Sequence, residues 1–375
     1  MIYLDYSATT PVDSEVVRTF SKACEEYWAN PNSLHKEGVK ANSLINAATE
    51  QISSILGVKP NEIIYTSGAS ESNNMAIKGI CLKYQNRGKH IITTDFEHSS
   101  IYGPVGYLQK LGFDVDFVNT LENGKVDIDH LKSLLRDDTI LVSITAVNSE
   151  IGIIEPIEEI GLLLKDYPKT FFHVDMTQSI GKKKIDLTNV DLASFSAHKF
   201  FGVKGIGVLL KKENINIEPI IHGGKSTTIY RSGTPATPLI ASISKALRLV
   251  TKDMNEHYEY VSNINKKVRD RLSSFEKVRI NSPEDSLPYI LNISILGVKP
   301  EVLLHALEEE EVYISTQTAC SSKSDESKAV YALTKDHDRS KSSVRISLSY
   351  KTTLDEIDKF LEIFERCYNK LTTLR

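Results

Sequence analysis

Short β-rich runs alternate with segments of helical period from about residue 60 to residue 210. The runs, in chain order, are EIIYTS, HIITTDF, DVDFVN, TILVSITAV, TFFHVDM, LASFSA and GIGVLL. Segments such as DIDHLKSLLRDD and PIEEIGLLLKDY, which have the apolar spacing of helices, lie between them. Strands that alternate with helices of this length predict a mainly parallel sheet with helices on both faces. We therefore expect a large α/β domain.

A second, smaller domain is expected after a long helical segment. Residues 235–275 are charged, have helical period and contain neither Gly nor Pro after Pro238. The strand-like runs YILNISI, VYIST and VRISLSY follow, with the helix-like segments PEVLLHALEEE and LDEIDKFLEIFERCYNKL. Thr353 and Glu356 form the capping-box pattern before the last of these. Because 375 residues exceed one ordinary core, we predict a large domain over residues 13–255 and a small α+β domain from residues 1–12 and 256–375.

Charge, hydropathy and cysteine usage exclude several classes of function. The net charge is −4, from 45 basic and 49 acidic residues spread along the chain, so no basic stripe suits nucleic acid. No apolar run reaches membrane-spanning length, and Asp5 interrupts any signal-peptide apolar region. The four cysteines form no CxxC pair and no metal-ligand spacing. We expect a cytoplasmic protein with no metal site and no direct nucleic-acid or membrane partner.

Polar residues that could bind a ligand or take part in catalysis follow several of the predicted strands. The segment YTSGASESNN (residues 65–74) turns through small residues into a helix, which indicates either an anion site or a plain N-capping turn. Asp175 ends an apolar strand and reads as a functional carboxylate or a turn residue. His98 and Lys199 also follow strands, and a structural histidine and a snorkelling lysine are the alternatives. Together an anion cradle, a carboxylate, a histidine and a lysine at one sheet edge meet the requirements of pyridoxal 5'-phosphate.

The same segments occur in the cysteine desulfurases, which this chain resembles from its first residues to about residue 350. The segments that carry the resemblance are IYLDYSATTPVD, EIIYTSGASESNNMAIKG, HIITTDFEHSS, DDTILVSITAVNSEIG, FHVDMTQSIGK, SFSAHKFFGVKGIG, RSGTPAT, TACSS and SSVRISLS. These enzymes are class V aminotransferase relatives of the NifS/IscS type. The resemblance implies the fold type I architecture of pyridoxal phosphate enzymes, in which a large α/β domain with a mainly parallel sheet is joined to a smaller α+β domain.

The resemblance also implies a role for each residue of the pattern. Lys199 would hold the cofactor covalently, Asp175 would pair with its pyridine nitrogen, and His98 would stack on the ring and move protons. Gln178 and Asn148 would contact the ring's phenolic oxygen. The phosphate would be bound by Ala69, Ser70, Ser196, His198 and, from a second subunit, Thr234. Arg345 would clamp the carboxylate of the substrate, L-cysteine.

Cys320 lies in STQTACSSKS, a polar run in which a packing cysteine is unexpected. The resemblance implies that its thiol takes the substrate's sulfur as a persulfide, releases L-alanine and passes the sulfur to an acceptor protein. Such a thiol must be accessible and partly ionised. Cys24, Cys81 and Cys367 lie among apolar neighbours in helical segments, and we expect packing roles for them.

Two positions depart from the family pattern. Ser149 follows Asn148 where the desulfurases usually have a second asparagine, and residues 225–228 read KSTT before the RSGT motif. Both departures leave the substrate or partner preference open. The resemblance implies a homodimer and an acceptor in iron–sulfur cluster assembly or in tRNA or cofactor thiolation. The alternatives are a related pyridoxal phosphate lyase or aminotransferase, such as a selenocysteine lyase, and a catalytically silent scaffold.

Overall fold

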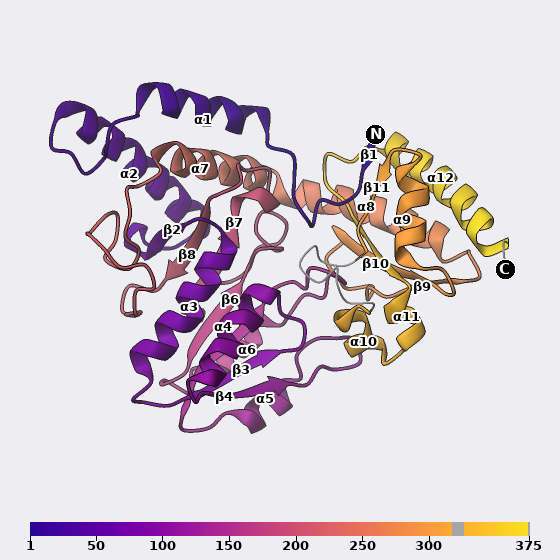
Figure 1. Ribbon diagram of the computed structural model, residues 1–375, viewed down its shortest axis with the longest axis horizontal. Helices are drawn as coiled ribbons and strands as arrows, with labels where there is room; N and C mark the ends of the chain where they lie inside the picture. Colours follow the sequence, from indigo (N-terminus) through magenta and orange to yellow (C-terminus); the bar gives the residue numbers. More distant parts are fainter. Residues whose placement is uncertain (317–325, 374–375) are drawn as a thin grey trace.

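The computed structural model describes residues 1–316 and 326–373, and Figure 1 shows them as two lobes. The larger lobe is built on a seven-stranded sheet of order β2-β8-β7-β6-β5-β3-β4. Its strands are β2 (Ile63–Thr66), β3 (His90–Thr94), β4 (Asp114–Val118), β5 (Thr139–Thr145), β6 (Phe171–Asp175), β7 (Leu192–Ser196) and β8 (Gly207–Lys211). Each run that the sequence predicts as a strand is one of them.

The sheet is mainly parallel, as predicted, with one antiparallel strand. The pairs β3–β4, β3–β5, β5–β6 and β6–β7 are parallel, whereas β8 runs antiparallel to both β7 and β2. Strand β2 therefore points the same way as β7. The carboxyl ends of β2, β3, β5, β6 and β7 consequently meet at one edge of the sheet, which is where open α/β sheets bind ligands.

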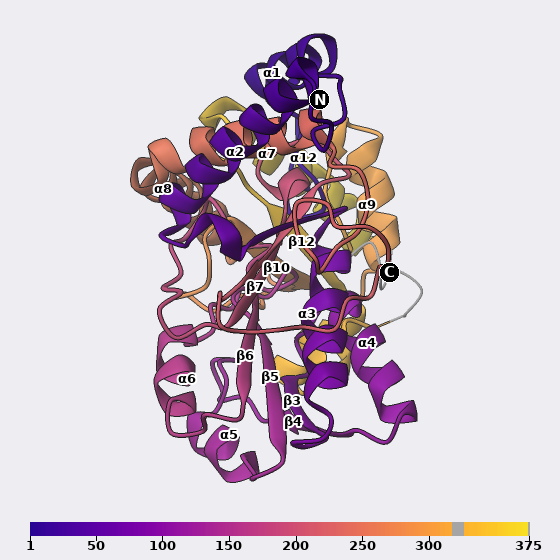
Figure 2. The same ribbon diagram turned by 90° about the vertical axis from the view of Figure 1, so that its left-hand side faces the viewer.

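Helices cover both faces of this sheet (Figure 2). One face packs on α3 (Ala69–Tyr84) and α4 (Ser99–Lys110) through an apolar cluster that includes Ile80 and Leu108. The other face packs on α2 (Lys36–Leu56), α5 (Ile128–Leu134), α6 (Ile157–Leu164) and α7 (Thr237–Lys252), with α1 (Ser14–Glu26) outside α2 and α7. Neighbouring residues of one strand point to opposite faces: Ile91 joins the first cluster and Ile92 the second.

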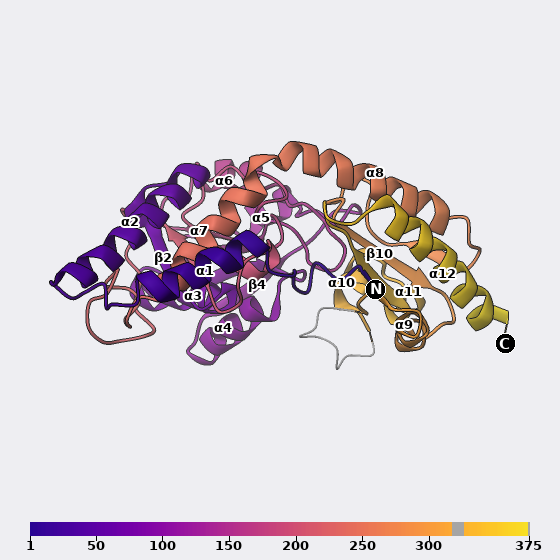
Figure 3. The same cartoon turned by 90° about the horizontal axis from the view of Figure 1, so that it is seen from above.

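The connection between the lobes consists of two helices. Helix α7 ends at Lys252, and Asp253 has φ −121° and ψ 37°, outside the helical region. Helix α8 (Met254–Leu272) then continues into the smaller lobe. Figure 3 shows α7 and α8 running along one side of both lobes. The helical segment predicted over residues 235–275 is thus present from Thr237 to Leu272, with a break at Asp253.

The smaller lobe contains an antiparallel sheet of order β12-β10-β9, from β9 (Val278–Ile280), β10 (Ile290–Ile295) and β12 (Ser343–Ser347). Its helices are α9 (Pro300–Glu308), α10 (Lys328–Thr334), α11 (His337–Lys341) and α12 (Leu354–Thr373). The start of the chain lies here, because β1 (Ile2–Tyr3) pairs in parallel with β11 (Val312–Tyr313). The capping box at α12 is confirmed: Glu356 N donates to Thr353 Oγ1 and Thr353 N to the Glu356 carboxylate. The domain limits at residues 12 and 255 stay a prediction.

Two smaller findings bear on the sequence predictions. No helix in the described part of the chain combines the length and the apolar character needed to cross a bilayer. Cys81 and Cys367 are buried, as expected of packing residues, but Cys24 is exposed, so its predicted packing role is wrong. Helix α1 buries only Val16 and Ala23, and Cys24 lies on the face that turns away from the sheet.

Candidate active site

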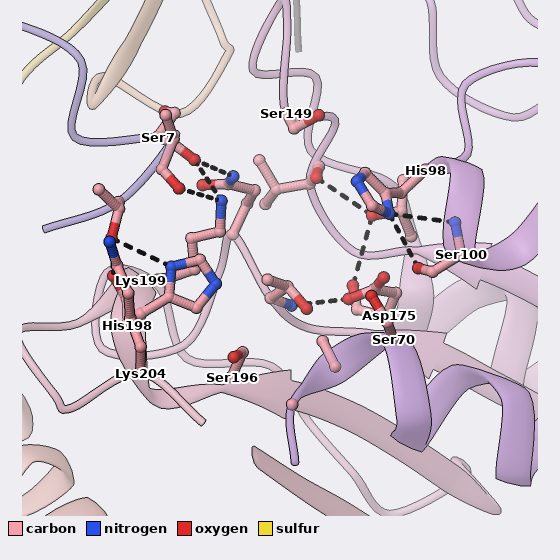
Figure 4. A pocket seen from close by; sticks show the side chains of 18 of the residues that line it. Ser7, Ser70, His98, Ser100, Ser149, Asp175, Ser196, His198, Lys199 and Lys204 are labelled. Atoms are coloured by element: carbon pink, nitrogen blue, oxygen red, sulfur yellow. Dashed lines mark hydrogen bonds between the residues drawn. The ribbon is translucent and has the colours of Figure 1, made fainter. Parts of the chain in front are cut away.

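A cavity of about 620 Å³ opens at the edge of the large sheet where the carboxyl ends meet (Figure 4). Its walls come from the loops after β2, β3, β5, β6 and β7, from residues 7–9 and from β12 of the smaller lobe. Nine of the residues proposed from the sequence line it: Ala69, Ser70, His98, Asp175, Gln178, Ser196, His198, Lys199 and Arg345. The fold thus gathers into one cavity residues that are up to 276 positions apart in sequence, from Ala69 to Arg345.

The anion cradle is the turn from β2 into α3. Its N-cap residue is Gly68, which has no side chain to accept from the first-turn N–H groups, so these donors lack partners within the helix. Ser67 N donates to the Glu71 carboxylate at 2.6 Å, and Arg231 Nε donates to the same carboxylate at 2.9 Å. Arg231 therefore neutralises Glu71 beside the cradle and keeps the pKa of that carboxyl low, against the effect of burial.

Gly207 fixes how closely the cradle approaches the sheet. A Cβ atom at residue 207 would lie 2.6 Å from Gly68 Cα and 2.7 Å from Phe195 O, both backbone atoms. Ser196, which pairs with Gly207 in the β7–β8 ladder, is buried, and its Oγ lies beside Gly68. The turn and the strand end therefore form one close-packed wall, and it has no room for a side chain at position 207.

Lys199 stands at the end of a short 3-10 turn, Ala197–Lys199, that follows β7. Its Nζ donates to Ser7 O at 2.6 Å and to Ala8 O at 2.8 Å, so the N-terminal segment positions the amine (Figure 4). His198 precedes it and shares a 3.2 Å hydrogen bond between Nδ1 and Thr9 Oγ1. Burial, together with Lys199 and Lys204, lowers the pKa of His198 to about 4, so this imidazole is neutral at physiological pH.

Asp175 is the last residue of β6 and is buried. Its Oδ1 accepts from Thr177 N at 2.9 Å, and its Oδ2 accepts from Asn73 Nδ2 at 2.8 Å. A buried carboxylate held by neutral donors is stabilised further by a cation, and a protonated pyridine nitrogen is such a cation.

His98 caps α4, accepting at Nδ1 from Ser100 N at 3.2 Å. Burial lowers its pKa, Lys199 lowers it further, and Asp175 opposes the shift. The ring is therefore neutral near pH 7, which suits both stacking on an aromatic ring and proton exchange.

Gln178 and Lys199 both donate to Ser7 O, and Gln178 also contacts a buried lysine, Lys182. The Gln178 Nε2 donates to Ser7 O at 3.0 Å, and its Oε1 accepts from Lys182 Nζ at 3.2 Å. Burial, then Lys199 and Arg345, lower the pKa of Lys182 to about 7. A charged Lys182 ammonium can donate hydrogen bonds but cannot accept them. The Gln178 carbonyl therefore faces Lys182, and the Gln178 NH₂ group faces Ser7 O.

Arg345 extends from β12 of the smaller lobe, and its side chain is only 2% exposed. Its Nη2 donates to Asp5 Oδ1 at 2.8 Å and its Nη1 to Ser149 O at 3.0 Å. Within the described residues its Nε is a buried donor that no acceptor satisfies. A guanidinium held in this way keeps N–H groups for a ligand carboxylate.

Two described residues of the sequence proposal, Asn148 and Thr234, do not line the cavity, and a third proposed residue is not described. Asn148 is buried with its amide used internally, since Nδ2 donates to Phe96 O and Oδ1 accepts from Glu150 N and Ile151 N; Ser149 lines the cavity instead. Thr234 is exposed, and the cavity of this chain does not include it. Cys320 lies outside the described residues.

Sequence reasoning missed several groups that hold the site together. Among them are the carbonyls of Ser7 and Ala8, the amine of Lys182 and the amide of Asn73. Asn73 carried a usable signal: it stands four residues after Ala69 in α3 and so lies on the face of the helix that opens at the cradle. The backbone carbonyls carried none, because any residue has one.

The cavity fits pyridoxal phosphate. It combines a helix N-terminus for a phosphate, a buried carboxylate for a protonated ring nitrogen, an amine for a Schiff base and a neutral imidazole. These four groups come from four different loops, and the same sheet edge positions them all.

Comparisons with known proteins point the same way. Residues 2–360 match the family model described as aminotransferase class-V. The chain is 40% identical to a NifS/IcsS protein homolog of Lactobacillus delbrueckii subsp. bulgaricus, covering 100% of this chain and 99% of that protein. It is 39% identical to the cysteine desulfurase IscS of Dictyoglomus turgidum, covering 100% and 96%.

Solved structures agree with the sequence comparisons. A NifS-like protein superposes with a TM-score of 0.94 at 34% identity, over 99% of this chain and 100% of that one. A structure described as SspA in complex with cysteine superposes with a TM-score of 0.82 at 31% identity, over 94% and 100%.

Proposed function

Because the chain belongs to the class-V aminotransferase family, we propose that it is a pyridoxal-phosphate-dependent cysteine desulfurase. It converts L-cysteine to L-alanine and retains the sulfur as a persulfide on Cys320. The observation that carries this proposal is that Lys199, Asp175 and the N-terminus of α3 share one cavity with the guanidinium of Arg345. The curated relatives named cysteine desulfurase, at about the same identity over the whole chain, support the reaction.

The chain's own groups hold the cofactor. The first-turn N–H groups of α3, with Ser196 and His198, would hold the phosphate, and Asp175 would keep the ring nitrogen protonated. Lys199 would bind the aldehyde carbon of the cofactor covalently through Nζ. When bound, pyridoxal phosphate supplies an electron sink that weakens the bonds at the α-carbon of an amino acid.

The substrate is oriented by Arg345. Its guanidinium is already held by Asp5 and Ser149 O, so little side-chain entropy is lost when a carboxylate binds its remaining N–H groups. Arginine suits this role because its planar fork matches a carboxylate bidentately. The cysteine carboxylate therefore faces the smaller lobe and its amino group faces Lys199.

Sulfur transfer needs a thiolate, and Cys320 is the residue we assign to it. The thiolate attacks the substrate sulfur, the carbon–sulfur bond of the substrate breaks as the sulfur–sulfur bond forms, and the carbon takes up a proton to give alanine. His98 is placed to move that proton. No net oxidation occurs, and an external thiol or acceptor protein then removes the sulfur.

The partners extend this proposal. We assign the sulfur to an acceptor protein of iron–sulfur cluster assembly or of tRNA or cofactor thiolation. A homodimer is supported by Thr234, which is exposed and lies away from its own chain's cavity, as a residue serving a neighbouring subunit would. A cytoplasmic location fits a thiol that must return to its reduced form.

The proposal is tested with the purified holoenzyme. Alanine production from L-cysteine, sulfide release with an added thiol, and borohydride trapping of the cofactor at Lys199 by peptide mass are measured for the wild type, Cys320→Ser and Lys199→Ala. We expect trapping and cysteine binding to persist in Cys320→Ser while alanine and sulfur transfer fall at least 100-fold. Undiminished transfer in Cys320→Ser would favour a lyase such as a selenocysteine lyase. A colourless wild type with nothing to trap would identify a silent scaffold.

A further inference from the structure

Asn73 lies in the first turns of α3, with no solvent exposure, between two residues of the active site. Its amide nitrogen donates to Asp175 Oδ2 at 2.8 Å and to Ser100 Oγ at 2.8 Å. The amide cannot be turned round, because its oxygen would then face the carboxylate oxygen of Asp175. Both hydrogens of Asn73 Nδ2 are therefore assigned.

The donor role of Asn73 determines the hydrogen-bond direction between Ser100 and His98. Its Oγ accepts from Asn73, so its own hydrogen is directed to another acceptor, and His98 Nδ1 lies 2.8 Å away (Figure 4). The backbone supports the same assignment independently. Ser100 N lies 3.2 Å from the same Nδ1, and an amide N–H can only donate. His98 Nδ1 consequently accepts from both groups of Ser100.

The proton of the neutral imidazole must then be on Nε2. A second proton on Nδ1 would break two hydrogen bonds, in addition to the cost of charging a half-buried ring beside Lys199. The charged groups that face His98 are Asp175 on β6 and Lys199 after β7, and their effects on the ring oppose each other. The hydrogen-bond chain, rather than the net charge around the ring, selects the tautomer.

Asn73 also bears a cost that a packing residue would not. Among the described residues no donor reaches its Oδ1, although that atom is buried. An apolar residue of similar volume would avoid this desolvation cost. Asparagine differs from an apolar residue at this position in its NH₂ group, which donates to both Asp175 and Ser100.

We propose that Asn73 is a positioning residue that, through Ser100, fixes His98 as the tautomer with its proton on Nε2. Within the function proposed above, Nε2 is then the ring nitrogen that exchanges protons with the substrate, and Nδ1 is closed to it. The chain Asp175–Asn73–Ser100–His98 joins the carboxylate that holds the ring nitrogen to the imidazole that moves protons. The tautomer itself does not depend on which amino acid is the substrate.

The test is the ¹⁵N NMR signal of the His98 ring in holoenzyme labelled at histidine, assigned by its loss in His98→Gln. Asn73→Leu and Ser100→Ala remove the two links, Ser100→Thr restores the hydroxyl, and Ser99→Ala, at the exposed neighbouring position, is the matched control. We expect Nε2–H in the wild type, Ser99→Ala and Ser100→Thr. Asn73→Leu and Ser100→Ala keep the backbone N–H of residue 100 as a donor to Nδ1, so we expect Nε2–H to remain the major tautomer with a detectable Nδ1–H population beside it. We expect the His98 pKa to rise by about 0.5–1 unit, as for the loss of one hydrogen bond to the neutral form.

Two outcomes would overturn the proposal. One is a proton on Nδ1 in the wild type, and the other is Ser100→Ala with the wild-type tautomer and pKa. Because Ser100→Ala removes only a hydroxyl, it decides the question even where Asn73→Leu does not fold. The measurement is made without cysteine, so an enzyme that shows Nε2–H but releases no sulfur would contradict the desulfurase function and leave the positioning role in place.

Discussion

Arg345 of strand β12 and Asp5 of the N-terminal segment form an ion pair in which Nη2 and Oδ1 are 2.8 Å apart. They are 340 positions apart in sequence, and Arg345 lines the cavity from the smaller lobe. Asp5 thus holds the guanidinium in place before any substrate is present. The pair connects the segment that follows β1 to strand β12.

Arg345→Lys should impair cysteine binding more than cofactor binding. Lysine keeps the charge but loses the planar fork, so a loss of about 2–3 kcal/mol is expected, which is roughly a 30- to 150-fold rise in KM for cysteine. Steady-state kinetics and cofactor absorbance are measured together. A normal KM with a lost cofactor spectrum would assign Arg345 to the cofactor rather than to the substrate.

Gly207→Ala should disrupt the cradle. The added Cβ would meet Gly68 Cα at 2.6 Å and Phe195 O at 2.7 Å, and backbone atoms cannot rotate aside. We expect a loss of about 1–3 kcal/mol of stability and at least tenfold weaker cofactor binding, measured by urea unfolding and by titration of the apoenzyme with pyridoxal phosphate.

Gly103→Ala is the control for that variant. Gly103 lies in helix α4, and a Cβ there meets nothing within 4 Å. Alanine should therefore stabilise the helix by up to about 1 kcal/mol without affecting the cofactor. Equal losses in the two variants would mean that the tight packing around Gly207 does not decide cofactor binding.

The elements of the large sheet could be predicted from the sequence because each strand is a local run with its own apolar pattern. Asp175, His98 and Lys199 could be found as polar residues at strand ends. The bonds of Asn73 and Lys182 could not, because both depend on which loops the sheet order brings together. The antiparallel direction of β8 could not be predicted either, because the apolar run GIGVLL indicates a strand but not its direction relative to its neighbours.

The position of Asn148 shows the limit of transferring roles by position. Its amide oxygen accepts from two backbone N–H groups of the loop after β5, and its amide nitrogen donates to Phe96 O after β3, so the side chain serves these loops and not the cavity. Only the neighbouring Ser149 reaches the cavity wall. Adjacent residues of a buried turn can face different sides, one toward the loop backbone and the other toward the cavity. Sequence spacing alone does not show which of the two side chains faces the cavity.

Lys182 should make the protein's stability depend on pH above neutrality. The folded pKa is about 7 and the ordinary value is 10.5, so between these values the unfolded chain holds a proton that the folded chain lacks. Stability therefore rises with pH across this window, by up to about 1.4 kcal/mol per pH unit. Lys182→Met should remove that slope, and Lys184→Met, at an exposed position, should keep it. Urea midpoints at pH 7, 8 and 9 distinguish them; parallel curves for Lys182→Met and the wild type would contradict the burial of this charge.

Glu97 should produce the opposite slope at lower pH. Its carboxyl is buried with Oε1 accepting from Thr94 Oγ1 and Thr145 N, while Oε2 is a buried atom with no partner among the described residues. Burial raises its pKa from 4.5 to about 8.

Between pH 4.5 and pH 8 the folded protein therefore keeps a proton on Glu97 that the unfolded chain releases. Stability is lost as pH rises through this window, again by up to about 1.4 kcal/mol per unit. Glu97→Gln keeps the neutral shape and should flatten the curve between pH 5 and pH 8 in urea unfolding, whereas Glu122→Gln on the surface should leave it unchanged. A Glu97→Gln curve as steep as that of the wild type would mean that this carboxyl is already ionised in the folded protein, and that the wall behind Phe96 and His98 carries a negative charge.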